Sequence, residues 1–306
     1  MSDKNSDTAV VRATLIGGLA VLLWSLLALL TTGAKGIPSF QLLAMTFTVA
    51  FTFSAVYLCF KGRSAWALMR QPLTVWALGV GGLFGYHFFY FVALANAPPV
   101  EASLIAYLWP LLIVVFSALL PGERLRWFHL AGAVLGLAGA ALLVTDGGNF
   151  SFSRQYTGGY LAAVACALTW SVYSVTNRLY GHIPTQLVGG ICGVVAVLAV
   201  LCHLVMETTV TPDMGQWLSI LGLGLGPVGA AFFVWDYGTK HGNIQVLGAM
   251  SYAAPLLSTV FLIAFGKAEA TTAILAACIL IVSGALLASR NLLRSKQTES
   301  NIGVTK

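Results

Sequence analysis

Residues 105–116 read IAYLWPLLIVVF, and residues 250–261, at an offset of 145, read MSYAAPLLSTVF. Six of the twelve positions are identical. Shared leucine or valine carries little weight in so apolar a chain, but a shared Tyr-x-x-Pro is more specific. Tyr107 and Pro110 correspond in this way to Tyr252 and Pro255. The chain therefore contains the same proline-interrupted apolar segment twice.

The composition indicates that lipid, not water, surrounds most of the chain. Of the 306 residues, 58% are hydrophobic and 8% are charged, and the mean hydropathy is +0.86. A soluble domain carries about 25% charged residues, which solvate its surface. The net charge of +6 is spread between apolar runs rather than clustered, which indicates membrane topology and argues against nucleic acid binding.

Hydropathy predicts ten membrane-spanning helices, because about 20 apolar residues are needed to cross the hydrocarbon core. The expected spans are residues 12–32, 38–60, 73–95, 101–120, 127–145, 157–178, 185–206, 216–238, 244–266 and 270–290. The connections between them are short, so no soluble domain is inserted. We expect an all-α integral membrane protein that functions as a monomer.

The basic residues predict the orientation in the membrane. With ten spans, one side holds both termini and 13 of the 16 basic residues. These are Lys4, Arg12, Lys61, Arg63, Arg70, Arg124, Arg126, Arg178, Lys240, Arg290, Arg294, Lys296 and Lys306, against Lys35, Arg154 and Lys267 on the other side. Cytoplasmic loops carry the excess of lysine and arginine, so both termini are expected in the cytoplasm.

The repeat extends beyond the opening pair. Further dipeptides recur at an offset of 145 or 146: Trp24-Ser25 as Trp170-Ser171, Ile37-Pro38 as Ile183-Pro184, and Gly139-Ala140 as Gly284-Ala285. This predicts two five-helix halves, residues 1–150 and 151–306. Because five is odd, the second half would enter the membrane from the opposite side, giving an inverted-topology repeat. In transporters this design lets one site open to either side in turn.

The two prolines predict interrupted helices. Pro110 and Pro255 each remove one backbone hydrogen bond within an apolar span and kink the helix. The kink could be a static feature of a packed bundle. Its presence in both halves favours a pivot that gates a site near the midplane, so both prolines are hinge candidates.

Several motifs resemble a known group of proteins. The 5+5 repeat, Glu123-Arg124-Leu125 and the run GAVLGLAGAALL (132–143) resemble the drug/metabolite transporter superfamily, EamA type. RATLIG (12–17), YLWP (107–110) and HGN (241–243) are similar to its bacterial aromatic amino acid exporters of the YddG kind. The resemblance covers residues 12–290. It implies export of aromatic and other neutral amino acids across a bacterial inner membrane.

Polar and aromatic residues within the spans are the candidate substrate-binding residues. Tyr86, His87 and Tyr90 lie at i, i+1 and i+4 of the third span, which would place them on one helical face. Tyr107 and Trp109 flank the proline kink, and Trp170 lies near mid-depth of the sixth span. Aromatic rings offer stacking and apolar contact. The secondary candidates are Trp24, Tyr173, Asn177 and Tyr252. Plain packing or a satisfied core histidine is the alternative for each.

The positions of the charged residues indicate whether transport is coupled to an ion gradient. Asp236, Glu101 and Glu207 all lie at span ends, which predicts interfacial charges, and no carboxylate is expected deep in a span. Carriers driven by protons or sodium often use one. The sequence therefore favours uncoupled export, with His87 as the one candidate proton site.

Other classes of protein are less well supported. There is no P-loop, no HExxH and no Cys/His spacing suited to zinc, so we expect no cofactor, no metal and no enzyme. The alternatives are a broader drug or metabolite exporter, proton-coupled through His87, a membrane enzyme acting on a lipid-linked substrate, and a non-transporting receptor. The repeat argues against a receptor, because a receptor does not need two exchangeable halves.

Overall fold

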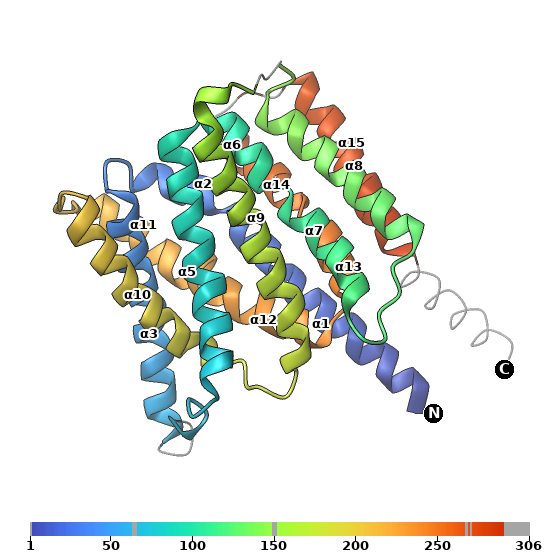
Figure 1. The fold of residues 1–306 in the computed structure, drawn as a ribbon, viewed down its shortest axis with the longest axis horizontal. Coiled ribbons are helices and arrows are strands. Elements are labelled where there is room, and N and C mark those ends of the chain that lie inside the picture. Colours follow the sequence, from blue (N-terminus) through green and yellow to red (C-terminus); the bar gives the residue numbers. More distant parts are fainter. Residues whose placement is uncertain (1, 63–65, 149–151, 267–268, 270, 291–306) are drawn as a thin grey trace, which may run out of the picture.

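The computed structural model describes residues 2–62, 66–148, 152–266, 269 and 271–290, and its helices are labelled in Figure 1. Up to residue 148 they are α1 (Ser2–Ser25), α2 (Leu27–Gly33), α3 (Ser39–Lys61), α5 (Leu73–Asn96), α6 (Pro99–Ala106), α7 (Trp109–Phe116), the 3₁₀ turn η1 (Ser117–Leu119) and α8 (Trp127–Val144). From residue 152 they are η2 (Arg154–Tyr156), α9 (Thr157–Asn177), η3 (Arg178–Tyr180), α10 (Leu187–Met206), α11 (Met214–Leu225), the π-helical η4 (Gly226–Ala230), α12 (Ala231–His241), α13 (Ile244–Met250), α14 (Ala253–Ala264) and α15 (Thr272–Ala288).

The chain is a multi-pass membrane protein. Nine helical segments in the described residues are long and apolar enough to cross a membrane, where the sequence predicted ten. They are Thr8–Gly33, Ser39–Lys61, Leu73–Asn96, Pro99–Leu119, Trp127–Val144, Arg154–Tyr180, Leu187–Met206, Met214–His241 and Ile244–Ala264. The predicted tenth span corresponds to α15, which has 17 residues. At 1.5 Å per residue it is about 25 Å long, slightly less than the hydrocarbon core of about 30 Å.

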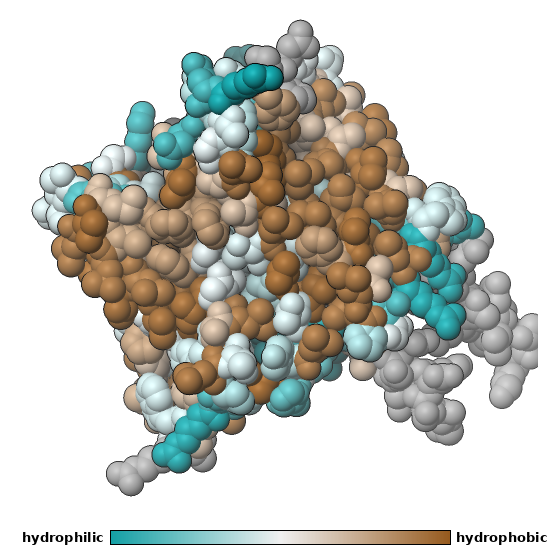
Figure 2. Space-filling model, viewed as in Figure 1, coloured by the Kyte–Doolittle hydropathy of each residue, from teal (hydrophilic) through white to brown (hydrophobic). Residues whose placement is uncertain are grey.

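The surface agrees with burial in lipid. Figure 2 shows apolar residues over most of one face, with hydrophilic residues gathered towards its upper and lower margins. Some residues that predict the orientation, namely Arg63, Lys267, Arg294, Lys296 and Lys306, lie outside the described residues, as does the expected boundary between residues 150 and 151.

The repeated segment is interrupted in both of its copies. Helix α6 ends at Ala106 and α7 begins at Trp109, with Pro110 in its first turn. Helix α13 ends at Met250 and α14 begins at Ala253, with Pro255 in its first turn. The sequence predicted a kink at each proline, and each span is in fact divided into two helices.

The main helix pairs join the part of the chain before residue 148 to the part after residue 152. Helix α8 packs on α15 along one edge of the molecule, and α3 packs on α10 at the opposite edge (Figure 1). Between these edges α5 packs on α9, and α1 packs on α12. The core is therefore formed by contacts between segments far apart in the sequence.

Glycines let α8 and α15 approach closely. Gly132 and Gly136 of α8 have the Gly-x-x-x-Gly spacing that permits close helix packing, and Gly284 of α15 lies against them. A Cβ added to Gly284 would lie 2.5 Å from the carbonyl oxygen of Gly132, and a Cβ on Gly132 would lie 2.5 Å from that of Gly284. Neither backbone can yield as a flexible side chain would, so both positions require glycine.

Gly284→Ala is therefore expected to destabilise the protein by about 1–3 kcal/mol, the usual cost of overpacking. Gly81→Ala is the matched control, because a Cβ added to Gly81 in α5 meets nothing within 4 Å. Thermal unfolding in detergent measures both variants. Equal transition temperatures for the two would show that the α8–α15 contact is not as close as described.

Candidate functional site

Four tryptophans from four helices meet in the interior. Trp24 of α1, Trp109 of α7, Trp170 of α9 and Trp235 of α12 have ring centroids 5.1–6.3 Å apart in all six pairings. Trp109, Trp170 and Trp235 are buried, and Trp24 is half-buried. We call these four residues the tryptophan cluster. Two of them come from the part of the chain before residue 148 and two from the part after it.

The polar atoms around the cluster are bonded to irregular backbone or to serines. The indole N–H of Trp24 donates to the carbonyl oxygen of Pro227, 3.1 Å away in the π-helical η4. The indole N–H of Trp235 donates to Ser174 Oγ at 3.1 Å. Ser171 Oγ donates to the carbonyl oxygen of Trp109 at 2.9 Å. Two of the four indole N–H groups, those of Trp24 and Trp235, are thus bonded to other helices, while the bond from Ser171 goes to the backbone of Trp109.

Helix α5 adds tyrosines beside the cluster. Tyr86 and Tyr90 are stacked, with ring planes 5° apart and centroids at 6.1 Å, and the Tyr86 ring lies 5.4 Å from that of Trp170. The Tyr90 hydroxyl is 3.4 Å from Ser103 Oγ of α6. Both tyrosines are half-buried, so part of each ring stays accessible.

His87 packs against Tyr86 as well as against apolar rings, and the centroids of the His87 and Tyr86 rings are 5.3 Å apart. Its ring lies 5.4 Å from Phe47 and 6.2 Å from Phe232, in an apolar setting. Its Nδ1 lies 2.7 Å from the carbonyl oxygen of Leu83, which can only accept, so Nδ1 carries the proton. The Nε2 atom is thereby left as an acceptor. Tyr86 is therefore in ring contact with both His87 and Tyr90, with centroids 5.3 Å and 6.1 Å apart.

Tyr252 occupies the break between α6 and α7. Its hydroxyl donates to the carbonyl oxygen of Tyr107 at 3.2 Å and accepts from the backbone N–H of Leu111 at 3.1 Å. In a continuous helix that N–H would bond that carbonyl directly, because the two residues are four apart. Tyr252 is fully buried. Its repeat counterpart Tyr107 is half-buried, and its hydroxyl makes no hydrogen bond within the described residues.

A second group of polar residues surrounds Asp236. The carboxylate accepts from Asn177 Nδ2 at 3.0 Å, from Thr185 Oγ1 at 2.6 Å and from Lys240 Nζ at 2.9 Å. Asp236 is only 3% exposed. The prediction of an interfacial charge is therefore wrong for Asp236, because α12 turns this face inward and Lys240 compensates the charge. Glu207, in contrast, lies at the end of α10 and accepts from the N–H groups of Phe40 and Gln41 at the start of α3.

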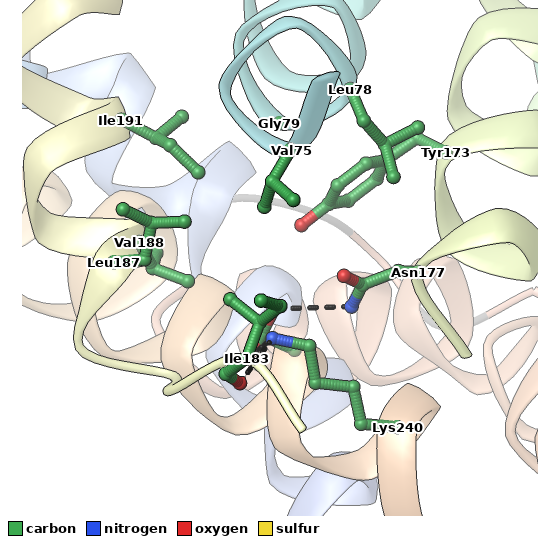
Figure 3. Close-up of a pocket in the computed structure, with 11 residues that line it drawn as sticks. Val75, Leu78, Gly79, Tyr173, Asn177, Ile183, Leu187, Val188, Ile191 and Lys240 are labelled. Atoms are coloured by element: carbon green, nitrogen blue, oxygen red, sulfur yellow. Dashed lines mark hydrogen bonds and ion pairs between the residues drawn. The ribbon is translucent and has the colours of Figure 1, made fainter. Parts of the chain in front are cut away.

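The Asp236 group borders a pocket between α5, α9, α10 and α12. Figure 3 shows Tyr173, Asn177 and Lys240 directed towards the same space. The remaining wall is aliphatic, and the lining residues are Val75, Leu78, Gly79, Tyr173, Asn177, Ile183, Leu187, Val188, Ile191, Asp236 and Lys240. The Tyr173 ring also lies 5.2 Å from that of Trp170, so the pocket adjoins the tryptophan cluster.

Several of these residues were not predicted from the sequence. Trp235, Thr185 and Lys240 were not candidates, and Asp236 was placed at an interface. A usable signal was present, because Asp236 and Lys240 are spaced i, i+4 and so face each other on one helix. The structure brings Tyr86, Trp109, Trp170 and Trp24 together, whereas Tyr252 lies in the helix break and Asn177 in the Asp236 group.

Comparisons with known proteins agree with this architecture. The model of the EamA-like transporter family matches residues 12–145 and again residues 157–290. The chain is 52% identical to the aromatic amino acid exporter YddG of Ancylobacter novellus over 278 residues, which cover 90% of this chain and 96% of the relative. It is 23% identical to the aromatic amino acid exporter YddG of Escherichia coli (strain K12) over 299 residues, again 90% and 96% of the two chains.

A solved crystal structure is also similar. It superposes with a TM-score of 0.88, at 51% sequence identity, and the match covers 92% of this chain and 98% of the solved one. The family that matches is one of transporters rather than of enzymes.

Trp170→Ala is expected to destabilise the protein by about 3–5 kcal/mol, because it leaves a cavity beneath several rings. Trp170→Phe keeps an aromatic side chain, so its loss of folding stability should be much smaller. Trp127→Ala is the control, since Trp127 is 66% exposed. Thermal unfolding in detergent measures the stabilities of the three variants. A Trp170→Ala variant as stable as Trp127→Ala would show that Trp170 is not a packed core residue.

Proposed function

The chain belongs to the EamA-like transporter family, and we propose that it exports aromatic and other neutral amino acids across a bacterial inner membrane. The observation that carries this proposal is the tryptophan cluster with the tyrosines beside it, combined with the 52% identity to an aromatic amino acid exporter. Aromatic rings recognise an aromatic or aliphatic side chain by stacking and apolar contact. The substrate is a small molecule, and the surrounding partner is the lipid bilayer.

We assign the contact with substrate to the partly accessible groups next to the cluster. Tyr86 and Tyr90 would stack on a substrate ring, and Tyr107 and His87 Nε2 would supply polar contacts. Trp109 and Trp170 would form the floor, because both are buried. Trp24 and Tyr173 would support them from neighbouring helices. Tyr252 is fully buried, so we assign it to the helix break rather than to the cavity.

The packing supports two inverted five-helix halves, residues 1–150 and 151–306, with α15 as the tenth span. A twofold axis that exchanges the halves would convert each contact between spans into a second, equivalent contact. Helix α1 packs on α12, and its counterpart α9 packs on α5, the counterpart of the span that contains α12. Similarly, α1 contacts α13 and α14, while α9 contacts α6 and α7. Helices α3 and α10 pack on each other, as do α8 and α15.

We infer that the two helix breaks exchange roles during transport. In the present conformation the Tyr252 hydroxyl bonds the carbonyl of Tyr107 and the N–H of Leu111 at the break between α6 and α7. The Tyr107 hydroxyl has no hydrogen bond within the described residues. Exchanging the conformations of the halves would place the Tyr107 hydroxyl between the carbonyl of Tyr252 and the N–H of Leu256. Pro110 and Pro255 keep each break available, because neither residue can donate a backbone hydrogen bond.

The excess of basic residues supports cytoplasmic termini. Transport by a monomer is part of the proposal. Coupling to protons is a separate question. The argument for uncoupled export was the absence of a deep carboxylate, but Asp236 is a buried carboxylate that is paired with Lys240. Uncoupled export remains the proposal, because this pair is already neutralised. His87 is the group through which proton coupling would act.

Sealed liposomes that contain the purified protein test the function. Loaded with labelled tryptophan, phenylalanine, threonine or leucine, they should release the amino acid without a pH gradient. Release only with a gradient would contradict uncoupled export and make His87 the leading proton site. Release of none of the four would contradict amino acid export and favour a broader drug or metabolite exporter. Liposomes without protein are the control for leakage.

Tyr252→Phe and Tyr107→Phe test the exchange of the breaks. Tyr252→Phe leaves the carbonyl of Tyr107 and the N–H of Leu111 without their partner, at a cost of about 1–3 kcal/mol per unsatisfied buried group. It should therefore depopulate the present conformation, and Tyr107→Phe should depopulate the opposite one. Distances between spin labels on the two sides of the protein measure the populations. A shift in the same direction for both variants would contradict the exchange.

A further inference from the structure

The charged residues of α12 join its end to the end of α9. Asp236 Oδ2 and Lys240 Nζ are 2.9 Å apart, and their side chains are 4% and 3% exposed, respectively. Asn177 at the end of α9 donates to Asp236 Oδ1 at 3.0 Å, and Thr185 donates to Oδ2 at 2.6 Å. Lys240 Nζ also donates to the carbonyl oxygen of Ile183 at 3.1 Å (Figure 3). Both charges therefore hold α9, or the connection that follows it, against α12.

Arg178 makes a second link between the same elements. Its Nη1 donates to the carbonyl oxygens of Thr239, Lys240 and Gly242 at 3.2, 3.3 and 2.6 Å, and its Nη2 lies 2.7 Å from Glu123 Oε1. A cation is favourable at the C-terminal end of a helix, because the last carbonyls have no partner within the helix. We call Asn177, Arg178, Thr185, Asp236 and Lys240 the α9–α12 network.

The equivalent helices of the other half are not joined in this way. The repeat makes α1 and α2 the counterparts of α9 and η3, and α5 the counterpart of the span that contains α12. Helix α12 packs on both α9 and η3. In the part of the chain that the structure describes, α5 makes no comparable packing with α1 or α2, and no hydrogen bond joins residues 24–33 to α5. Of these two equivalent contacts, only the one with the α9–α12 network is formed.

The sequence of α5 cannot supply a second ion pair of this kind. An offset of 145 or 146 places residues 90–91 (YF) opposite Asp236 and residues 94–95 (LA) opposite Lys240. These four residues of α5 are half-buried or exposed, whereas both charged residues of α12 are buried. Exchanging the conformations of the halves would therefore break the polar bonds at one end without forming equivalent bonds at the other.

We propose that the α9–α12 network is a lock, which favours the conformation closed at this end of the molecule. This is the cytoplasmic end in the orientation proposed above. Opening would separate α9 from α12 and break the bonds of Asn177 and Thr185 to Asp236. The pair of Asp236 and Lys240 lies within α12, so it would stay intact. A buried charge that loses its partner is strongly destabilising, and this internal pairing is what makes the lock reversible.

The lock would set the resting conformation of the transporter. The proposal rests on the alternating access of two halves proposed above. Two similar halves give two conformations of similar energy, and polar bonds that exist in only one of them shift the population towards it. The protein would therefore rest closed to the cytoplasm, and opening the α9–α12 network would precede the uptake of each substrate molecule.

Distances between pairs of spin labels test the lock. Leu15 in α1 and Leu179 in η3 are both exposed and report on the proposed cytoplasmic end, because α1 packs on α12. Thr32 in α2 and Asn96 at the end of α5 are also exposed and report on the opposite end. The labels are attached to cysteines introduced at these positions, in a full-length chain whose five native cysteines are replaced by alanine.

Asp236→Asn with Lys240→Gln removes both charges together and leaves neither unpaired. Hydrogen bonds to charged groups are the stronger ones, so the population open at the proposed cytoplasmic end should increase at least about tenfold. The distance from Leu15 to Leu179 should lengthen, and that from Thr32 to Asn96 should shorten. Thr185→Val removes one bond to Asp236 and should shift the populations in the same direction by a smaller factor. This second variant decides the question if the double variant does not fold.

Glu207→Gln is the matched control, because Glu207 is paired with His203 where α10 meets α3, at the opposite end of the molecule. Helices α3 and α10 are counterparts and stay packed on each other in both conformations, so the control should leave the populations unchanged. Wild-type distances in both lock variants, or an equal shift in the control, would overturn the lock. Liposome release decides the function separately. A wild type that releases no amino acid overturns the proposed function, whereas shifted distances in the lock variants would still support the lock.

Discussion

The absence of water in the bilayer core is the constraint on which this structure depends. A backbone N–H or C=O group within the hydrocarbon must find a partner in the protein. The break between α6 and α7 would leave two such groups unpaired, and the hydroxyl of Tyr252 bonds both of them. The π-helical segment η4 is stabilised in the same way, because the carbonyl oxygen of Pro227 accepts a hydrogen bond from the indole N–H of Trp24. At these two places another helix supplies the polar side chain that irregular backbone needs.

This constraint explains which parts of the structure could be predicted. Apolar spans and their order follow from hydropathy, and the Tyr-x-x-Pro repeat marks both helix breaks. The partners of the glycine motif could not be predicted, because the contact of Gly132 with Gly284 depends on how α8 meets α15. Asp236 was misplaced for a similar reason. Position near the end of a span suggested an interface, but the rotation of α12 turns the side chain inward.

The tryptophan cluster belongs to the core, and it is also part of the substrate site proposed above. Three of its four rings are buried and pack on one another, so they contribute to the core. One of these rings, that of Trp170, also lies against Tyr86 and Tyr173, with centroids 5.4 Å and 5.2 Å away. A substitution in the cluster therefore changes stability and the shape of the site together. The polar residues at the edge of the cluster, in contrast, can be changed without opening a cavity.

The two copies of the repeated segment differ in their environments. Tyr107 and Tyr252 occupy equivalent positions in the sequence, yet one is half-buried without a hydrogen bond within the described residues and the other is buried with two. In the exchange proposed above, a second arrangement of comparable energy would give each segment the environment of the other. Such near-equality is what a transporter requires, because it must visit both conformations without a large external driving force. The repeated segment quoted at the outset can therefore be understood as a pair of similar elements of which one is supported at a time.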